Sequence, residues 1–140
     1  YRYEYLLFLG RWTQKEYLLK MERTMPIADW VNRELSNDAK ILIESEPRQF
    51  YFNRDLIRDG YLKHRTHYNE ILKNPSSISQ FFKSHGITHI LLTDPVSERI
   101  LETASTLRTF TKSHLVKKIY QVESQNIRDQ KYFYRLYQVT

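Results

Sequence analysis

Apolar positions recur at helical spacing twice in the first third of the chain. Thr13 and Glu16 form a capping-box pattern in front of a run that predicts a helix through residues 14–23. Pro26 suits the first turn of a second helix, whose apolar side chains share one face and which ends near residue 36. The pattern therefore predicts two consecutive helices before the first strand.

Shorter apolar and alternating runs follow these helices. The run AKILIES at residues 39–45 predicts a buried strand. QFYFN at 49–53 and DLIRD at 55–59 predict two further extended pieces around a turn at Asn53 and Arg54.

A helix and the clearest strand of the chain come next. Ser77 and Gln80 match a second capping box, and Gly86 stands where a left-handed residue would close the helix. ITHILLTD at 87–94 is apolar and rich in β-branched residues, which predicts a strand. Asp94 and Pro95 then predict the N-cap and first turn of a helix that runs to residue 110.

The chain ends with two alternating runs, 115–123 and 131–139, whose polar connection is typical of a hairpin. Strands separated by helices favour parallel pairing, and the hairpin adds an antiparallel edge. The expected fold class is α/β, a small Rossmann-like sandwich with helices on a largely parallel central sheet and a C-terminal antiparallel hairpin. Residues 1–140 are expected to form one soluble domain, with 1–12 as a connecting segment.

Composition narrows the function classes. The three glycines have no phosphate-loop spacing, and the absence of cysteine excludes disulfides and thiolate nucleophiles. The longest apolar runs, 5–10 and 87–93, are far shorter than the ~20 residues of a membrane span, so no transmembrane helix or signal peptide is expected. The net charge of +6 favours an acidic partner or surface. The first residue is Tyr1 rather than methionine, which favours a fragment of a larger protein.

Candidate binding residues lie where the predicted strands end. Glu44, Glu46 and Asp94 follow two apolar strands, and the carboxyl ends of strands are where open α/β sheets bind ligands. Arg48 and Arg54 lie at the ends of the neighbouring extended pieces. These five residues are the candidate binding site, no catalytic residue is assigned among them, and a helix cap is the structural alternative for Asp94.

Two other patterns carry weaker chemistry. Histidines at 64 and 67 with Glu70 are too sparse for a metal site, so no metal or cofactor is expected. The segment 48–73 interleaves cations with aromatic residues, as single-stranded nucleic-acid sites do, but acidic residues within it offset the charge and core-facing aromatics are the simpler explanation. A cluster without acidic residues would suit an anionic lipid surface and comprises Arg108, Lys112, Lys117 and Lys118.

Three stretches together resemble a known family. They are FLGRWTQKEYLLKMERTMPIADWVNRELSNDAKILIESEPRQFYFNRDLIRD, HGITHILLTD and YFYRLYQV. This pattern, from about Leu9 to Val139, resembles the soluble C-terminal domain of polytopic bacterial glycosyltransferases. Those enzymes use polyprenyl-phosphate sugars and are related to the protein mannosyltransferases. The matching positions define a fold rather than a catalytic site.

The resemblance implies a domain on the extracytoplasmic, periplasmic side of the inner membrane, within an integral membrane protein. Its partners would be the transmembrane portion of the same polypeptide and a polyprenyl-phosphate-sugar, an acceptor or an anionic membrane surface. In that family the catalytic acid lies between early membrane helices, so no catalytic residue carries over to this chain. The alternative is a soluble module that binds single-stranded nucleic acid through 48–73, although nucleic acid is the less favoured partner.

Overall fold

A mixed five-stranded sheet forms the centre of the computed structural model, which describes residues 4–44, 46, 48–58, 74–95, 106–125 and 129–140. The strand order is β2-β1-β3-β5-β4. The strands are β1 (Lys40–Glu44), β2 (Asp55–Arg58), β3 (His89–Pro95), β4 (Val116–Gln125) and β5 (Lys131–Val139). β1 pairs in parallel with β2 and β3, whereas β5 pairs antiparallel with both β3 and β4.

The α/β class is confirmed, but the expectation of a largely parallel sheet is wrong. The hairpin supplies the two longest strands, and its apolar member β5 lies inside the sheet while β4 forms the edge. Tyr134 and Leu136 of β5 are fully buried, whereas Lys117 and Lys118 of β4 are exposed. Burial of the more apolar strand and exposure of the charged one explain this order, since lysines on an edge strand also oppose further pairing.

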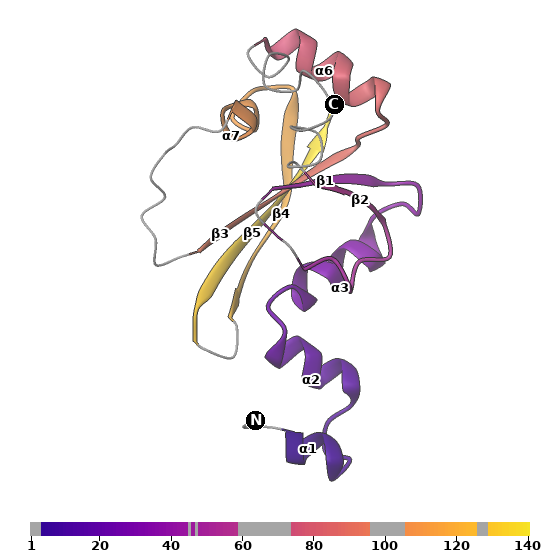
Figure 1. Ribbon diagram of the computed structural model, residues 1–140, viewed down its shortest axis with the longest axis vertical. Helices are drawn as coiled ribbons and strands as arrows, with labels where there is room; N and C mark the ends of the chain where they lie inside the picture. Colours follow the sequence, from indigo (N-terminus) through magenta and orange to yellow (C-terminus); the bar gives the residue numbers. More distant parts are fainter. Residues whose placement is uncertain (1–3, 45, 47, 59–73, 96–105, 126–128) are drawn as a thin grey trace.

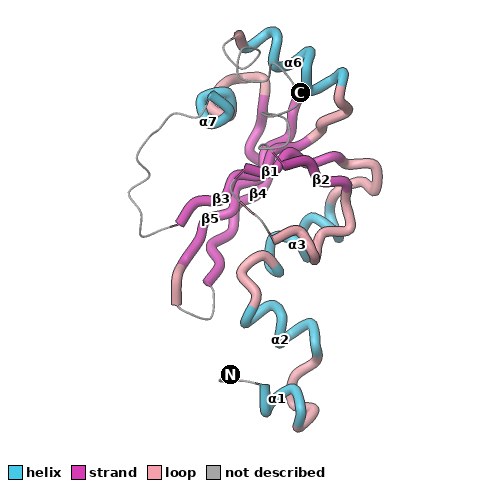
Figure 2. The backbone as a smooth tube through the Cα atoms, in the orientation of Figure 1, coloured by secondary structure: helices cyan, strands magenta, loops and turns pink. Residues whose placement is uncertain are grey.

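Helices cover both faces of the sheet (Figure 1). They are α1 (Glu4–Phe8), α2 (Gln14–Met21), α3 (Met25–Glu34), α6 (Pro75–Ser84) and α7 (Thr106–Phe110). In Figure 2, α3 lies on one side of the sheet, α6 and α7 lie on the other, and α2 and α1 lead away from it. The helices within the described ranges are all too short or too polar to cross a bilayer.

Two apolar clusters pack the sheet between these helices. On the α3 face, Ile27 and Val31 pack with Ile41 and Ile43 of β1. On the other face, helix residues including Phe82 pack with the core residues Leu42, Ile90 and Leu92. Strands β1 and β3 are therefore buried on both sides, which explains why their sequences are almost continuously apolar.

The helix ends test the capping predictions. The box at Thr13 and Glu16 is confirmed, with the backbone N–H of Glu16 donating to Thr13 Oγ1 at 3.2 Å. The predicted cap at Ser77 is wrong, because α6 begins at Pro75 and its N-cap is Asn74, three residues before Ser77. An Asn-Pro pair caps the helix and sets its first φ angle. Gly86 has φ of 67°, which confirms the left-handed residue after α6.

Two other predictions need correction. Residues 49–53 form a turn rather than a strand, and only Asp55–Arg58 pairs with β1. Asp94 and Pro95 belong to β3 rather than to a helix start, because they pair with Phe133 and Tyr132 of β5. The first part of the predicted helix, 96–105, and the histidines at 64 and 67 lie outside the described residues.

Candidate functional site

Two charged clusters lie at the carboxyl ends of β1 and β3, one on each face of the sheet. Side chains alternate along a strand, so Glu44 follows Leu42 onto the α7 face. Asp94 follows Leu92 onto the same face. Glu46 instead reaches Tyr134 on the α3 face. The sequence-predicted carboxylates therefore share one end of the sheet but are divided between its two sides.

The Asp94 cluster comprises Glu44, Asp94, Arg108 and Arg135. Arg108 contacts Glu44 Oε1 through Nε at 3.0 Å and Asp94 Oδ1 through Nη1 at 2.5 Å. Arg135 Nη1 donates to Asp94 Oδ2 at 2.7 Å. The side chain of Asp94 is only 3% exposed, so both its oxygens are occupied by guanidinium groups in a nearly dry position. Arg108 thereby fastens α7 to the ends of β1 and β3.

The charges around Arg108 keep its guanidinium protonated. Burial lowers the pKa of Arg108, but the charges of Glu44 and Asp94 and their hydrogen bonds outweigh it and raise this pKa overall. A general base must be free to take a proton from its substrate. The carboxylate oxygens of Asp94 are already engaged in short charge-assisted hydrogen bonds, so this arrangement suits attachment rather than proton transfer.

The Glu46 cluster comprises Arg23, Glu46, Tyr132 and Tyr134, with the backbone of Arg48. Arg23 Nη2 lies 3.2 Å from Glu46 Oε2, and the Tyr134 hydroxyl donates to the same oxygen at 2.9 Å. The backbone N–H of Arg48 donates to Oε1 at 2.8 Å. Arg23 also stacks its guanidinium over the Tyr132 ring at 4.0 Å. These contacts fasten the junction between α2 and α3 to β5.

The hydroxyl of Tyr134 keeps its proton in this position. Burial raises the pKa of Tyr134, and the charge of Glu46 and the hydrogen bond to it raise this pKa further. A phenol with a raised pKa does not act as a base near neutral pH. Because the side chain of Glu46 has no exposed surface, the group serves as a buried anchor.

The guanidinium groups of the two remaining predicted residues, Arg48 and Arg54, bind partners other than Glu44, Glu46 and Asp94. The guanidinium of Arg48 pairs with Glu22, and its hydrogen bond to Glu22 raises the pKa of Arg48. Arg54 lies elsewhere, beyond the end of α3. Its guanidinium donates to the backbone carbonyls of Asn32, Ser36 and Leu35, at 2.9, 2.8 and 2.7 Å respectively. Arg54 thus binds carbonyl groups that the end of a helix leaves without intrahelical partners.

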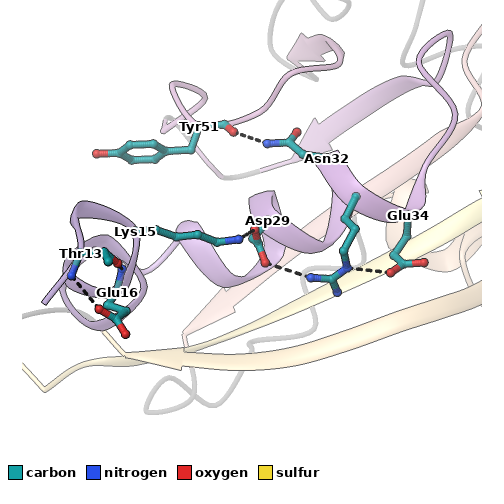
Figure 3. A network of polar contacts seen from close by, with 8 residues as sticks. Thr13, Lys15, Glu16, Asp29, Asn32, Glu34 and Tyr51 are labelled. Atoms are coloured by element: carbon teal, nitrogen blue, oxygen red, sulfur yellow. Dashed lines mark hydrogen bonds and ion pairs between the residues drawn. The ribbon is translucent and has the colours of Figure 1, made fainter.

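A third polar network lies on the surface of α2 and α3 (Figure 3). Lys15 lies 2.8 Å from Asp29, which also contacts Arg33 at 3.1 Å. Asn32 donates to the carbonyl of Tyr51 at 2.7 Å and holds the connection between β1 and β2 against α3. The cations Lys15 and Arg33 are more than half exposed, so this network contributes little to stability.

Sequence patterns missed the cations that complete the clusters, namely Arg23, Arg108 and Arg135. The sequence places Arg108 in a basic cluster with Lys112, Lys117 and Lys118, but its guanidinium binds Glu44 and Asp94 of the same fold. Arg135 carried a usable signal. It is the one charge within YFYRLYQV, and a charge within an apolar strand needs a buried partner. In the part of the chain that is described, no three His, Asp or Glu side chains are placed to hold a metal ion.

Comparison with family models and with curated proteins finds no match to this chain. The fold and the two clusters define an α/β domain whose charged residues bind its helices to one end of the sheet.

Proposed function

We propose that this chain is a non-catalytic extracytoplasmic accessory domain of an integral membrane glycosyltransferase-like protein. The proposed place is the periplasmic side of the inner membrane. The observation that carries the proposal is the internal pairing of Glu44, Glu46 and Asp94 with arginines of the same fold. Carboxylates engaged in this way favour a binding or positioning role, with the chemistry in the membrane-embedded part. The glycosyltransferase parent rests on the resemblance of the sequence pattern.

The proposed role is to help hold the acceptor or the lipid-phosphate-sugar beside the catalytic part. The carboxyl ends of β1 and β3 are where open α/β sheets bind ligands, and both clusters border this edge. Arg108 and Arg135 keep 20% and 25% of their side chains exposed, so their outer surfaces can meet an anionic headgroup while their inner surfaces bind Asp94.

Two measurements test the proposal. The native gene upstream of Tyr1 should encode roughly eight or more apolar spans of ~20 residues. The isolated protein should not transfer sugar from a polyprenyl-phosphate donor, whereas the full-length protein should, with a raised KM for the acceptor when this domain is deleted. A native gene that encodes no such spans would exclude the proposal, and so would transfer activity in the isolated domain.

In the described part of 48–73, exposed Phe50 is the feature that suits the nucleic-acid alternative, whereas the arginines and Phe52 do not. Arg48 and Arg54 bind Glu22 and backbone carbonyls, and Phe52 is buried in the core. A labelled single-stranded oligonucleotide at low salt provides the check. Tight binding that weakens steeply with salt would favour this alternative.

A further inference from the structure

The N-terminal end of the structure exposes an unusual amount of apolar surface. We define the apolar arm as residues 4–12, which comprise α1 and the turn after it. Tyr5, Phe8 and Leu9 are 57%, 90% and 62% exposed. In Figure 1, α1 is the element farthest from the sheet, with α2 between them. Three large apolar side chains this close in sequence and this exposed are typical of an interaction surface.

The rest of the described chain does not share this property. Outside the arm, the exposed large apolar side chains in the described ranges are Leu19 on α2 and Phe50 in the turn after β1. Leu19 is only 37% exposed, and Phe50 stands between Gln49 and Tyr51 without an aliphatic neighbour in sequence. Within the described ranges, exposed large apolar side chains that are close in sequence therefore occur in the arm.

The turn after α1 pairs its backbone N–H groups with carbonyls of α1. The N–H groups of Leu9, Gly10 and Arg11 donate to the carbonyls of Tyr5, Leu7 and Leu6, at 2.9, 3.0 and 2.9 Å. Gly10 has φ of 68°, and this left-handed residue ends α1 in a tight turn. Because these N–H groups of the turn are already paired, they add little desolvation cost when the neighbouring apolar side chains enter a lipid interface.

We infer that the apolar arm binds the interface of an anionic lipid bilayer. Charge favours this occupant, because residues 4–20 carry more exposed cations than exposed acids and the whole chain has a net charge of +6. The cations are Arg11, Lys15 and Lys20, and the acids are Glu4 and Glu16. Tyr5 and Phe8 are aromatic, and aromatic residues gather at membrane interfaces. A second copy fits less well, since a five-residue helix and a turn offer far less than the roughly 1,000 Å² of a stable interface.

The inference rests on the proposed function, because it specifies which surface of the accessory domain meets the membrane. The test is co-sedimentation of the 140-residue protein with vesicles of phosphatidylcholine, with and without phosphatidylglycerol. Binding should require phosphatidylglycerol. Phe8→Ser should weaken it about tenfold, since burial of a Phe side chain is worth roughly that factor. Arg11→Gln and Lys20→Gln should each weaken it about fivefold.

Phe50→Ser is the matched control, because it makes the same substitution at a position 97% exposed but outside the arm. Its binding should equal that of the parent protein, and circular dichroism should show that each variant is folded. Absence of vesicle binding, or equal losses in Phe8→Ser and Phe50→Ser, would overturn the inference. Self-association that Phe8→Ser abolishes, without vesicle binding, would overturn it in favour of a dimer.

These outcomes are separable from those of the proposed function. An upstream sequence without membrane spans would remove the glycosyltransferase parent yet leave vesicle binding by the arm intact. Spans upstream together with no vesicle binding would retain the accessory domain and exclude lipid as the occupant of its apolar arm.

Discussion

Replacement of Asp94 by asparagine tests whether the Asp94 cluster holds the fold together. Asp94 receives Arg108 at 2.5 Å and Arg135 at 2.7 Å, and its side chain is 3% exposed. Asparagine keeps the size of the side chain but removes the charge. The substitution leaves two cations at the end of the sheet, and among the described residues only Arg108 has a second carboxylate partner, Glu44.

The magnitude follows from burial. Removal of one partner from a buried ion pair costs about 3–5 kcal/mol. Arg108 and Arg135 retain some solvent contact, and Glu44 still neutralises Arg108, so Asp94→Asn should lower the free energy of unfolding by about 2–4 kcal/mol. Asp29→Asn is the matched control, because Asp29 also contacts two cations, at 2.8 and 3.1 Å, but at the surface. Its cost should be below about 1 kcal/mol.

Urea unfolding followed by Trp fluorescence measures both variants. With an m value of roughly 2 kcal/mol/M, the midpoint for Asp94→Asn should fall by about 1–2 M while that for Asp29→Asn stays close to the parent. Equal shifts for the two variants would refute the reasoning, because they would show that burial does not set the value of these pairs. An unchanged midpoint for Asp94→Asn would also refute it.

Three further substitutions or conditions test separate features. Arg54→Ala removes donors to the last carbonyls of α3 and should cost about 1–3 kcal/mol in urea unfolding, with no rescue by Arg54→Lys, which lacks the planar fork. Gly86→Ala should cost about 1 kcal/mol, because φ is 67° while an added Cβ would meet nothing closer than 4.0 Å. Burial lowers the pKa of His89 below its ordinary 6.5, so the unfolded chain takes up the proton first as the pH falls. Stability should therefore be highest above pH 6.5 and decrease below it, and His89→Gln should reduce that slope in unfolding at pH 7.5 and 5.5.

Local patterns predicted the elements well where one interaction within the chain decides them. Thr13 and Glu16 satisfy each other across one turn, and Gly86 takes the left-handed conformation that few other residues tolerate. Alternation along 131–139 likewise predicted β5, because Tyr134 and Leu136 share one buried face. Such signals lie within a few residues of the feature they specify.

Pairing between distant segments escaped the same patterns. The position of β5 next to β3 depends on which hairpin strand would expose more apolar surface at the edge of the sheet. That choice involves contacts with β3 as well as the two strands of the hairpin. The Asp94-Pro95 pair predicts a helix N-cap at Asp94, but both residues pair with β5 in the sheet. Local capping preferences amount to about 1 kcal/mol, so a continuous ladder of strand pairs and two arginine contacts override them.

The candidate site shows the same division. The ends of β1 and β3 were predicted from their apolar runs, and with them the placement of Glu44, Glu46 and Asp94 at one edge. The arginines that bind these carboxylates come from α7, from β5 and from the junction before α3. The pairs Arg23–Glu46, Arg135–Asp94 and Arg108–Glu44 are separated by 23, 41 and 64 residues in the sequence, and Tyr134 lies 88 residues from Glu46. No spacing rule connects such residues.

The arrangement of the clusters explains how charged residues at the ends of strands can serve attachment rather than catalysis. Helix α7 and the α2–α3 junction approach this edge from opposite faces, and each brings an arginine to a carboxylate. Such pairs add little net stability compared with apolar contacts. A shift of the helix that left one of these buried charges unpaired would, however, cost free energy. They therefore fix where each helix sits on the sheet. The accessory role proposed above would need that precision, whereas a catalytic carboxylate needs an oxygen free to meet its substrate.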